Sequence, residues 1–331
     1  MTGARPMPEG PHLLTVRRAV RAWFGEHCPE RAVVVGLSGG ADSLALTAAC
    51  VAEGAQVHAV VVDHALQAGS AEVAHRAAEQ ARDLGCSRAE VRTVSVTGAG
   101  GPEAAARRAR YAALDAVRGD RPILLGHTLD DQAETVLLGL ARGSGSRSLR
   151  GMAAWDPPRG RPLLTVRRES TVGACAELGL AAWDDPHNLD PSFVRVRLRG
   201  EVLPLLEDVL HGGVAGALAR TADQLREDGA VLDALAADIA VSARVGDALE
   251  VSALVEVPGA LRRRVIREWL ADCGVPLRNE AQVRAVDDLV GAWRGQGGVA
   301  VAGGGPVERL VVERRRGKLD LVRWTGRAAS E

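Results

Sequence analysis

The 331-residue chain lacks several features that would assign it to a familiar class of protein. Its five cysteines form no C-x-x-C pair, which argues against an iron–sulfur cluster or a zinc knuckle and fits a reducing compartment. No apolar run has the length of a membrane span, and the N-terminus lacks the apolar core of a signal peptide. We therefore expect a cytoplasmic protein with no membrane partner.

An excess of charge of one sign is also missing. The formal net charge is -1, which argues against a protein whose whole surface grips nucleic acid but leaves room for local basic patches. Lysine is nearly absent, since Lys318 is the single lysine and the other basic residues are arginines. What is present is 47% hydrophobic residues, in a chain long enough for two domains and a sizeable core.

One stretch near the N-terminus organises the chain. Residues 32–37 are a continuous apolar run, which is typical of a strand buried on both faces, and residues 44–49 favour a helix. The glycines between them let the backbone approach an anion, and the serines add hydroxyl donors beside the positive end of the helix. This turn consists of Ser38, Gly39, Gly40, Ala41, Asp42 and Ser43.

The turn is not a Walker loop, because the G-x-x-x-x-G-K-[ST] pattern is absent and no lysine is near. A glycine turn in an ordinary α/β domain is the alternative. The hexapeptide S-G-G-x-D-S resembles the PP-loop of the N-type ATP pyrophosphatases, whose fold is adenine nucleotide α-hydrolase-like. In that family the loop holds the α-side phosphates of ATP and pyrophosphate leaves.

Strands alternate with helices along the first part of the chain. This order predicts an α/β fold with a doubly wound parallel sheet, whose carboxyl edge binds ligands and carries the glycine turn. The later part predicts amphipathic helices and then short strands, and hence a smaller, mostly helical C-terminal domain. We expect domains at residues 1–211 and 212–331. The first four strands are expected at 32–37, 57–62, 90–96 and 122–126.

A second candidate site follows the fourth expected strand. Asp131 and Glu134 lie three residues apart, which places both carboxylates on one helix face, close to His127 in the sequence. The alternative for the acids is local, because Thr128 and Asp131 have capping-box spacing and acids favour a helix start. A separate alternative for His127 is a hydrogen-bonded structural histidine. Because both sites follow strands of one parallel sheet, we expect them to share a cleft.

The chain carries the strings G-H-x-x-D-D-Q-x-E-T-x-L-L at 126–138 and R-G-S-G-x-x-x-L-x-G-M at 142–152. In combination with several shorter motifs they resemble the tRNA(Ile)-lysidine synthetase family over roughly residues 30–210. Gln67 stands where the family carries an arginine, so the resemblance implies no phosphate or tRNA contact at this position, while the ATP site is unaffected. Further agreement comes from D-H-x-L at 63–66, E-x-x-A-R-x-x-R-Y at 103–111, R-P-L-L at 161–164, D-P-H-N at 185–188 and R-x-R-x-R at 195–199.

The resemblance implies a ligase that uses ATP and Mg²⁺. Its substrates are free L-lysine and the wobble cytidine of a tRNA(Ile) with a CAU anticodon. ATP adenylates the C2 carbonyl oxygen of the cytidine and pyrophosphate leaves. The ε-amine of lysine then attacks C2 and AMP leaves.

Carried onto this sequence, the resemblance assigns five catalytic side chains. Asp42 ligates Mg²⁺, and Asp131 and Glu134 hold the lysine ammonium. His127 and Arg107 stabilise charge on the adenylated intermediate or orient the cytidine. The alternative for Asp42 is an Asx turn that only orders the loop. The alternative for His64 is burial at the end of a strand. The residues assigned to ATP are Ser38, Gly39, Gly40, Ala41, Asp42, Ser43, Asp63 and His64.

The tRNA needs phosphate contacts, for which arginines of an expected loop at 142–168 and at 195–199 are candidates. The alternating arginines at 195–199 do not share a helical face, so buried pairing with Asp184 or Asp185 is an alternative. Two rival functions stay open: tRNA 2-thiolation on the same fold, which the scattered cysteines do not favour, and a nucleotide sensor without turnover. A homodimer is left open.

Overall fold

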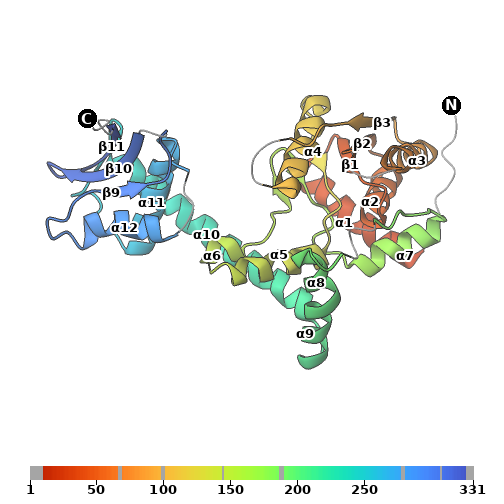
Figure 1. Cartoon of the computed structure of the whole chain (residues 1–331). Coiled ribbons are helices and arrows are strands. Elements are labelled where there is room, and N and C mark those ends of the chain that lie inside the picture. The colour runs from red at the N-terminus through yellow and green to blue at the C-terminus, as the bar shows by residue number, and fades with distance from the viewer. Residues whose placement is uncertain are drawn as a thin grey trace. The chain divides into compact units, whose positions relative to one another are not determined.

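The computed structural model describes residues 10–65, 69–97, 101–143, 145–185, 190–276, 280–305 and 308–325 (Figure 1). The chain divides into two compact units. The first comprises Met1–Leu138 and Arg150–Ala222, and the second Gly139–Leu149 and Asp223–Glu331. The expected domain boundary between residues 211 and 212 falls in the turn before α10 (Val214–Ala243) and stays a prediction.

A mostly parallel sheet forms the centre of the first unit. β1 (Ala32–Leu37) pairs in parallel with β2 (Gln56–Asp63) on one side and with β4 (Ile123–Leu124) on the other. The strand order is β3-β2-β1-β4-β6-β5, and the edge strand β5 is antiparallel to β6. The predicted parallel sheet is thus confirmed. The other strands are β3 (Arg88–Thr93), β5 (Trp155–Asp156) and β6 (Arg159–Gly160).

Helices cover both faces of this sheet. They are α1 (Pro11–His27), α2 (Ala41–Ala52), α3 (Ser70–Asp83), α4 (Pro102–Arg118) and α7 (Arg168–Leu178). Because strand side chains alternate, Val33 and Val35 enter the main core with residues of α1, α2, α3 and α7. Val34 points to the opposite face, where it packs in a cluster with Leu114 of α4. The doubly wound arrangement follows from this alternation.

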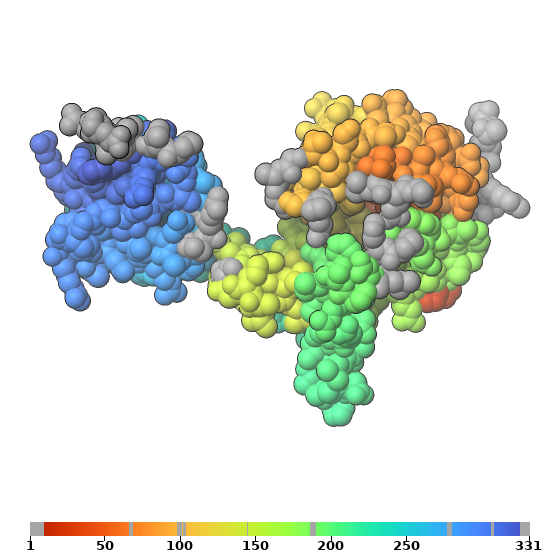
Figure 2. Space-filling model, in the orientation of Figure 1, coloured from red at the N-terminus to blue at the C-terminus, as the bar shows by residue number. Residues whose placement is uncertain are grey.

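Two short helices and a π-helical turn complete the first unit beside α5 (Leu129–Ala141). They are α8 (Val194–Arg197), η2 (Leu198–Val202) and α9 (Leu203–Val209), which Figure 2 shows in green as a projection from this unit. Among the described residues no single helix is long and apolar enough to cross a membrane. One helix pair, Val194–Val209 with Val214–Ala243, would be long and apolar enough together by length and composition, but the two helices are bent by 95° at the break between them.

The second unit has its own core, built from helices and a small antiparallel sheet of order β7-β8-β11-β10-β9. Trp269 of α11 is fully enclosed there, and its indole N–H donates to the Asp247 carbonyl over 2.7 Å. The expected helices followed by strands are confirmed, although β7 and β8 were not expected. The elements are α6 (Ser146–Leu149), β7 (Arg244–Val245), β8 (Ala248–Glu250), α11 (Gly259–Asp272), α12 (Glu280–Gly291), β9 (Val299–Val301), β10 (Glu308–Arg315) and β11 (Lys318–Thr325).

Candidate active site

Hydrogen bonds of its own serines fix the conformation of the glycine turn between β1 and α2. The Ser43 hydroxyl lies 3.1 Å from the Ser38 hydroxyl, accepts the Ser38 N–H at 3.1 Å and donates to the Gly40 carbonyl at 2.9 Å. Gly39 has a φ of +84°, a left-handed conformation that favours glycine, and its carbonyl accepts the Trp183 N–H. The turn therefore presents the start of α2 at the carboxyl end of β1.

Gly126 brings the end of β4 against this turn. A Cβ at position 126 would lie 3.0 Å from backbone atoms of Asp42 and Ser43. Only a residue without a side chain permits so close an approach. The sequence places Gly126 immediately before His127, so this contact also fixes where the α5 segment begins relative to α2.

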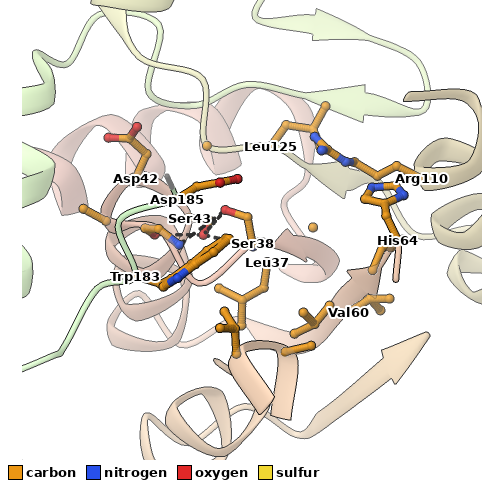
Figure 3. Close-up of a pocket in the computed structure, with 18 of the residues that line it drawn as sticks. Leu37, Ser38, Asp42, Ser43, Val60, His64, Arg110, Leu125, Trp183 and Asp185 are labelled. Carbon is orange, nitrogen blue, oxygen red and sulfur yellow. Dashed lines mark hydrogen bonds between the residues drawn. The ribbon is translucent and has the colours of Figure 1, made fainter. Parts of the chain in front are cut away.

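A cavity of about 610 Å³ opens at this carboxyl edge of the sheet (Figure 3). Residues that follow β1, β2 and β4 line it, together with Arg168 and Arg199. The expected shared cleft is thus present in the first unit. The predicted site residues on its lining are Ser38, Gly40, Ala41, Asp42, Ser43, Asp63, His64, His127 and Asp131; Gly39, Arg107 and Glu134 are described but do not line it.

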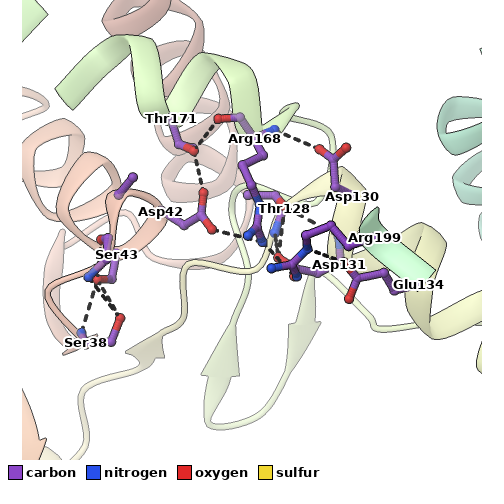
Figure 4. Close-up of polar contacts among 12 residues, drawn as sticks. Ser38, Asp42, Ser43, Thr128, Asp130, Asp131, Glu134, Arg168, Thr171 and Arg199 are labelled. Atoms are coloured by element: carbon purple, nitrogen blue, oxygen red, sulfur yellow. Dashed lines mark hydrogen bonds and ion pairs between the residues drawn. The ribbon is translucent and has the colours of Figure 1, made fainter. Parts of the chain in front are cut away.

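Asp42 lies in the first turn of α2 and binds residues of α7 (Figure 4). Its Oδ1 accepts a short hydrogen bond from the Thr171 hydroxyl, and its Oδ2 lies 3.1 Å from Arg168 Nη2. Burial raises the pKa of the Asp42 carboxyl, while Arg168 and Thr171 oppose that change. The described residues hold no group of three or more His, Cys, Asp or Glu side chains suited to a metal ion. Mg²⁺ can be bound by a single carboxylate together with phosphates and water, and the role of Asp42 as that carboxylate stays a prediction.

Asp131, at the start of α5, is held by four donors. Its Oδ2 accepts the Thr128 N–H at 2.8 Å and the Thr128 hydroxyl at 2.9 Å, so the capping interaction is present. Its Oδ1 accepts Arg168 Nη2 at 2.9 Å and Arg199 Nη2 at 3.1 Å. Burial alone would raise the pKa of Asp131, but Arg168 and Thr128 outweigh it and lower the pKa. The carboxylate is thus ionised and fixed.

Glu134 lies one turn further along α5 and is fully buried. Arg199 Nε donates to its Oε1 at 2.7 Å, and Arg195 Nη1 lies 3.5 Å from its Oε2. Burial raises the pKa of Glu134, and Arg199 opposes the change. Arg195 and Arg199 therefore pair with Glu134, and not with Asp184 or Asp185, which the sequence offered as alternative partners. Glu134 reaches the cavity through the guanidinium of Arg199.

The two histidines of the cavity are uncharged near neutral pH. Burial lowers the pKa of His127 to about 4, and its Nδ1 is buried without a hydrogen-bond partner among the described residues. Burial also lowers the pKa of His64, with help from Arg110, which lies beside it in Figure 3. Asp63 accepts the Ala65 N–H at 2.9 Å and so shapes the turn after β2.

Arg107 lies on α4, where its guanidinium carbon is 4.9 Å from the centre of the Tyr111 ring. Tyr111 lines the cavity, as does Arg110, whereas Arg107 acts on His127 as a nearby charge. Gln67 and the Pro186-His187-Asn188 stretch lie outside the described residues.

Two residues of α7 were not expected at the site. Arg168 was a candidate tRNA contact, and Thr171 carried no prediction, yet both bind Asp42. The neighbouring R-P-L-L string was the only sequence feature that marked this segment as part of the family pattern. Its spacing does not show which carboxylates the side chains of α7 contact. The expected loop at 142–168 also contains α6, β5 and β6.

Comparisons with known proteins agree with this geometry. A model of the PP-loop domain matches residues 13–206, and a model of the TilS substrate binding domain matches residues 249–319. A protein of Rhodococcus jostii named tRNA(Ile)-lysidine synthase is 62% identical over 95% of this chain and 97% of its own. One of the same name from Nocardia farcinica is 64% identical over 93% of this chain and 98% of its own.

Among solved structures, the U34-tRNA thiolase NcsA of Methanococcus maripaludis superposes with a TM-score of 0.52 at 20% sequence identity. The match covers 65% of this chain and 80% of the thiolase. At that identity the likeness concerns the fold alone.

Proposed function

The chain belongs to the tRNA(Ile)-lysidine synthase family, ATP-dependent ligases that act on tRNA, and on this premise we propose how its cavity carries out the ligation. ATP transfers AMP to the C2 carbonyl oxygen of the wobble cytidine of a CAU-anticodon tRNA(Ile), and pyrophosphate leaves. The ε-amine of free L-lysine then attacks C2, the C2–O bond breaks, AMP leaves and the amine loses a proton.

The glycine turn is the proposed phosphate site. Ser38, Gly40, Ala41 and Ser43 line the cavity at the positive end of α2, so backbone N–H groups of this turn and the serine hydroxyls would bind the phosphates. Asp42 would hold the Mg²⁺ that accompanies ATP, and the ion would neutralise charge on the departing pyrophosphate. Asp63 and His64, at the end of β2, line the part of the cavity proposed for the nucleoside.

Asp131 and Glu134 are the proposed site of the lysine ammonium: Asp131 lines the cavity and would contact the ammonium, whereas Glu134 does not line it and would act through Arg199. A small cation needs fixed carboxylates, and these two are oriented by Thr128 and by arginines rather than by solvent. His127, neutral at pH 7, can hydrogen-bond the cytidine without adding charge. Arg107 would add positive potential behind it.

One observation carries this proposal: a single nitrogen of Arg168 contacts both Asp42, which follows β1, and Asp131, which follows β4. The proposed metal ligand and the proposed amine ligand are thus neighbours. Holding substrates in line at such a site supplies on the order of 7–11 kcal/mol of a reaction barrier, more than one acid or base contributes.

The decisive experiment incubates the purified protein with ATP, Mg²⁺ and labelled lysine. Label should enter tRNA(Ile) with a CAU anticodon and not a tRNA(Met) with the same anticodon. An absence of label in tRNA(Ile) would refute the proposal. Pyrophosphate release that depends on tRNA would separate this enzyme from a sensor without turnover.

The alternatives raised from the sequence are not favoured, because relatives 62–64% identical over most of the chain carry the name tRNA(Ile)-lysidine synthase. We propose that residues 212–331 recognise the tRNA, since the match to the substrate binding domain lies within them. A cytoplasmic location and a homodimer remain predictions, and light scattering of the purified protein tests the second.

A further inference from the structure

Arg168 occupies an unusual position at the first residue of α7 (Figure 4). A cation there opposes the helix dipole, which favours acids at a helix start. Its backbone N–H donates to Asp130 Oδ2 at 2.8 Å, and its carbonyl accepts the Thr171 hydroxyl at 2.8 Å. These two contacts anchor the main chain independently of the guanidinium.

The side chain instead joins the two halves of the proposed site. Its Nη2 lies 3.1 Å from Asp42 Oδ2 and 2.9 Å from Asp131 Oδ1. The same side chain lines the cavity that Ser38 also lines, and it is 30% exposed, so solvent rather than protein surrounds part of it. Its Nε is buried without a hydrogen-bond partner among the described residues, and so the present arrangement leaves one donor unsatisfied.

The carboxylates proposed for substrate cations are already occupied by guanidinium groups. Asp131 Oδ1 forms ion pairs with both Arg168 and Arg199, and Asp42 forms an ion pair with Arg168. An ammonium that enters beside Asp131 must displace one of these contacts. Arg199 is tied to the buried Glu134 by a 2.7 Å contact, whereas the only carboxylates paired with Arg168 in the described structure are Asp42 and Asp131. Arg168 is thus the guanidinium that phosphates at the glycine turn can draw away.

We propose that Arg168 is a positioning residue that makes lysine binding depend on bound nucleotide. Without nucleotide its guanidinium fills the space between Asp42 and Asp131 and competes with the ammonium. With phosphates at the glycine turn the guanidinium moves to them and leaves Asp131 Oδ1 to the amine. This inference rests on the proposed function, because it takes the carboxylate pair as the lysine site.

The test is a thermodynamic cycle on the full-length protein. Lysine is titrated calorimetrically with and without a saturating ATP analogue that cannot be cleaved between the α and β phosphates, in the presence of Mg²⁺. In the wild type the analogue should lower the Kd for lysine on the order of tenfold. In Arg168→Gln the Kd without nucleotide should fall towards the nucleotide-bound value, and the dependence on nucleotide should disappear. Arg168→Lys keeps the charge and should keep part of the dependence.

The matched control is Arg21→Gln, which removes a guanidinium from Glu53 at the other end of α2. It should leave the dependence on nucleotide unchanged, and circular dichroism should show that every variant is folded. The inference is overturned if the Kd for lysine does not depend on nucleotide in the wild type. It is also overturned if that dependence persists in Arg168→Gln, or if it disappears equally in Arg21→Gln. If the wild type also fails to attach lysine to tRNA(Ile), the proposed function itself is wrong; if it attaches lysine, only the coupling by Arg168 is refuted.

Discussion

Gly126→Ala should damage nucleotide binding without direct contact with the nucleotide. The added Cβ would meet the carbonyl carbon and oxygen of Asp42 and the nitrogen of Ser43, each at 3.0 Å, where ordinary contact begins at 3.4 Å. These are backbone atoms in the first turn of α2 and cannot rotate away. The turn must therefore shift by several tenths of an ångström from the end of β4.

Overpacking of this kind costs about 1–3 kcal/mol. If the strain is relieved by displacement of the glycine turn, the KM for ATP rises by roughly 5- to 150-fold, at 1.4 kcal/mol for each factor of ten. The assay is tRNA-dependent exchange of pyrophosphate into ATP, with urea unfolding to separate local from global loss.

The matched control is Gly25→Ala in α1, where an added Cβ meets nothing within 4 Å. It should leave the KM for ATP unchanged and raise the free energy of unfolding by up to about 1 kcal/mol, since alanine favours a helix more than glycine does. If Gly126→Ala changes neither the KM nor the unfolding midpoint, the close approach of β4 to α2 is not what shapes the turn.

Three further predictions concern individual side chains. Asp42→Asn should abolish pyrophosphate exchange, and normal exchange would contradict its role with Mg²⁺. Asp131→Asn or Glu134→Gln should raise the KM for lysine by roughly 10- to 150-fold, the equivalent of a charge-assisted hydrogen bond, while exchange stays measurable; unchanged lysine kinetics would remove both from the pocket. Because burial lowers the pKa of His127 from 6.5 to about 4, the unfolded chain takes up this proton first, and stability should fall as the pH falls from 6.5 towards 4. His127→Gln should flatten that fall in urea unfolding by at most about 1.4 kcal/mol per pH unit, and an unaltered slope would contradict the shift.

The sequence predicted the long strands of the sheet well and the two-residue strands poorly. β1 was expected at 32–37 and forms over the same residues, because a run of valines buried on both faces has few alternatives. β4 was expected over 122–126 but covers two residues, and β5 and β6 were not expected at all. Strands of two residues contain too little pattern for periodicity to detect, and only their neighbours in the sheet define them.

The same distinction holds at the site. The glycine turn and the His127–Glu134 segment were recognisable because their chemistry lies within a few residues of one another. The contacts of Asp42 with Thr171 and Arg168 join residues 129 and 126 positions apart, and no local spacing reports them. Whether the arginines at 195–199 face solvent or carboxylates is likewise decided by packing against α5. Long-range partners of charged groups are a tertiary property.

The position of α7 in the chain sets when the cavity can exist. The strands that supply its floor are complete by residue 124, but the side chains that neutralise its acids arrive only with Arg168 and Arg199. The main core of the first unit likewise includes Leu163, Val166, Ala174 and Cys175, so this segment completes the core as well as the cavity. A fragment that ends near residue 150 would retain the glycine turn yet expose Asp42 and Asp131 without their counterions.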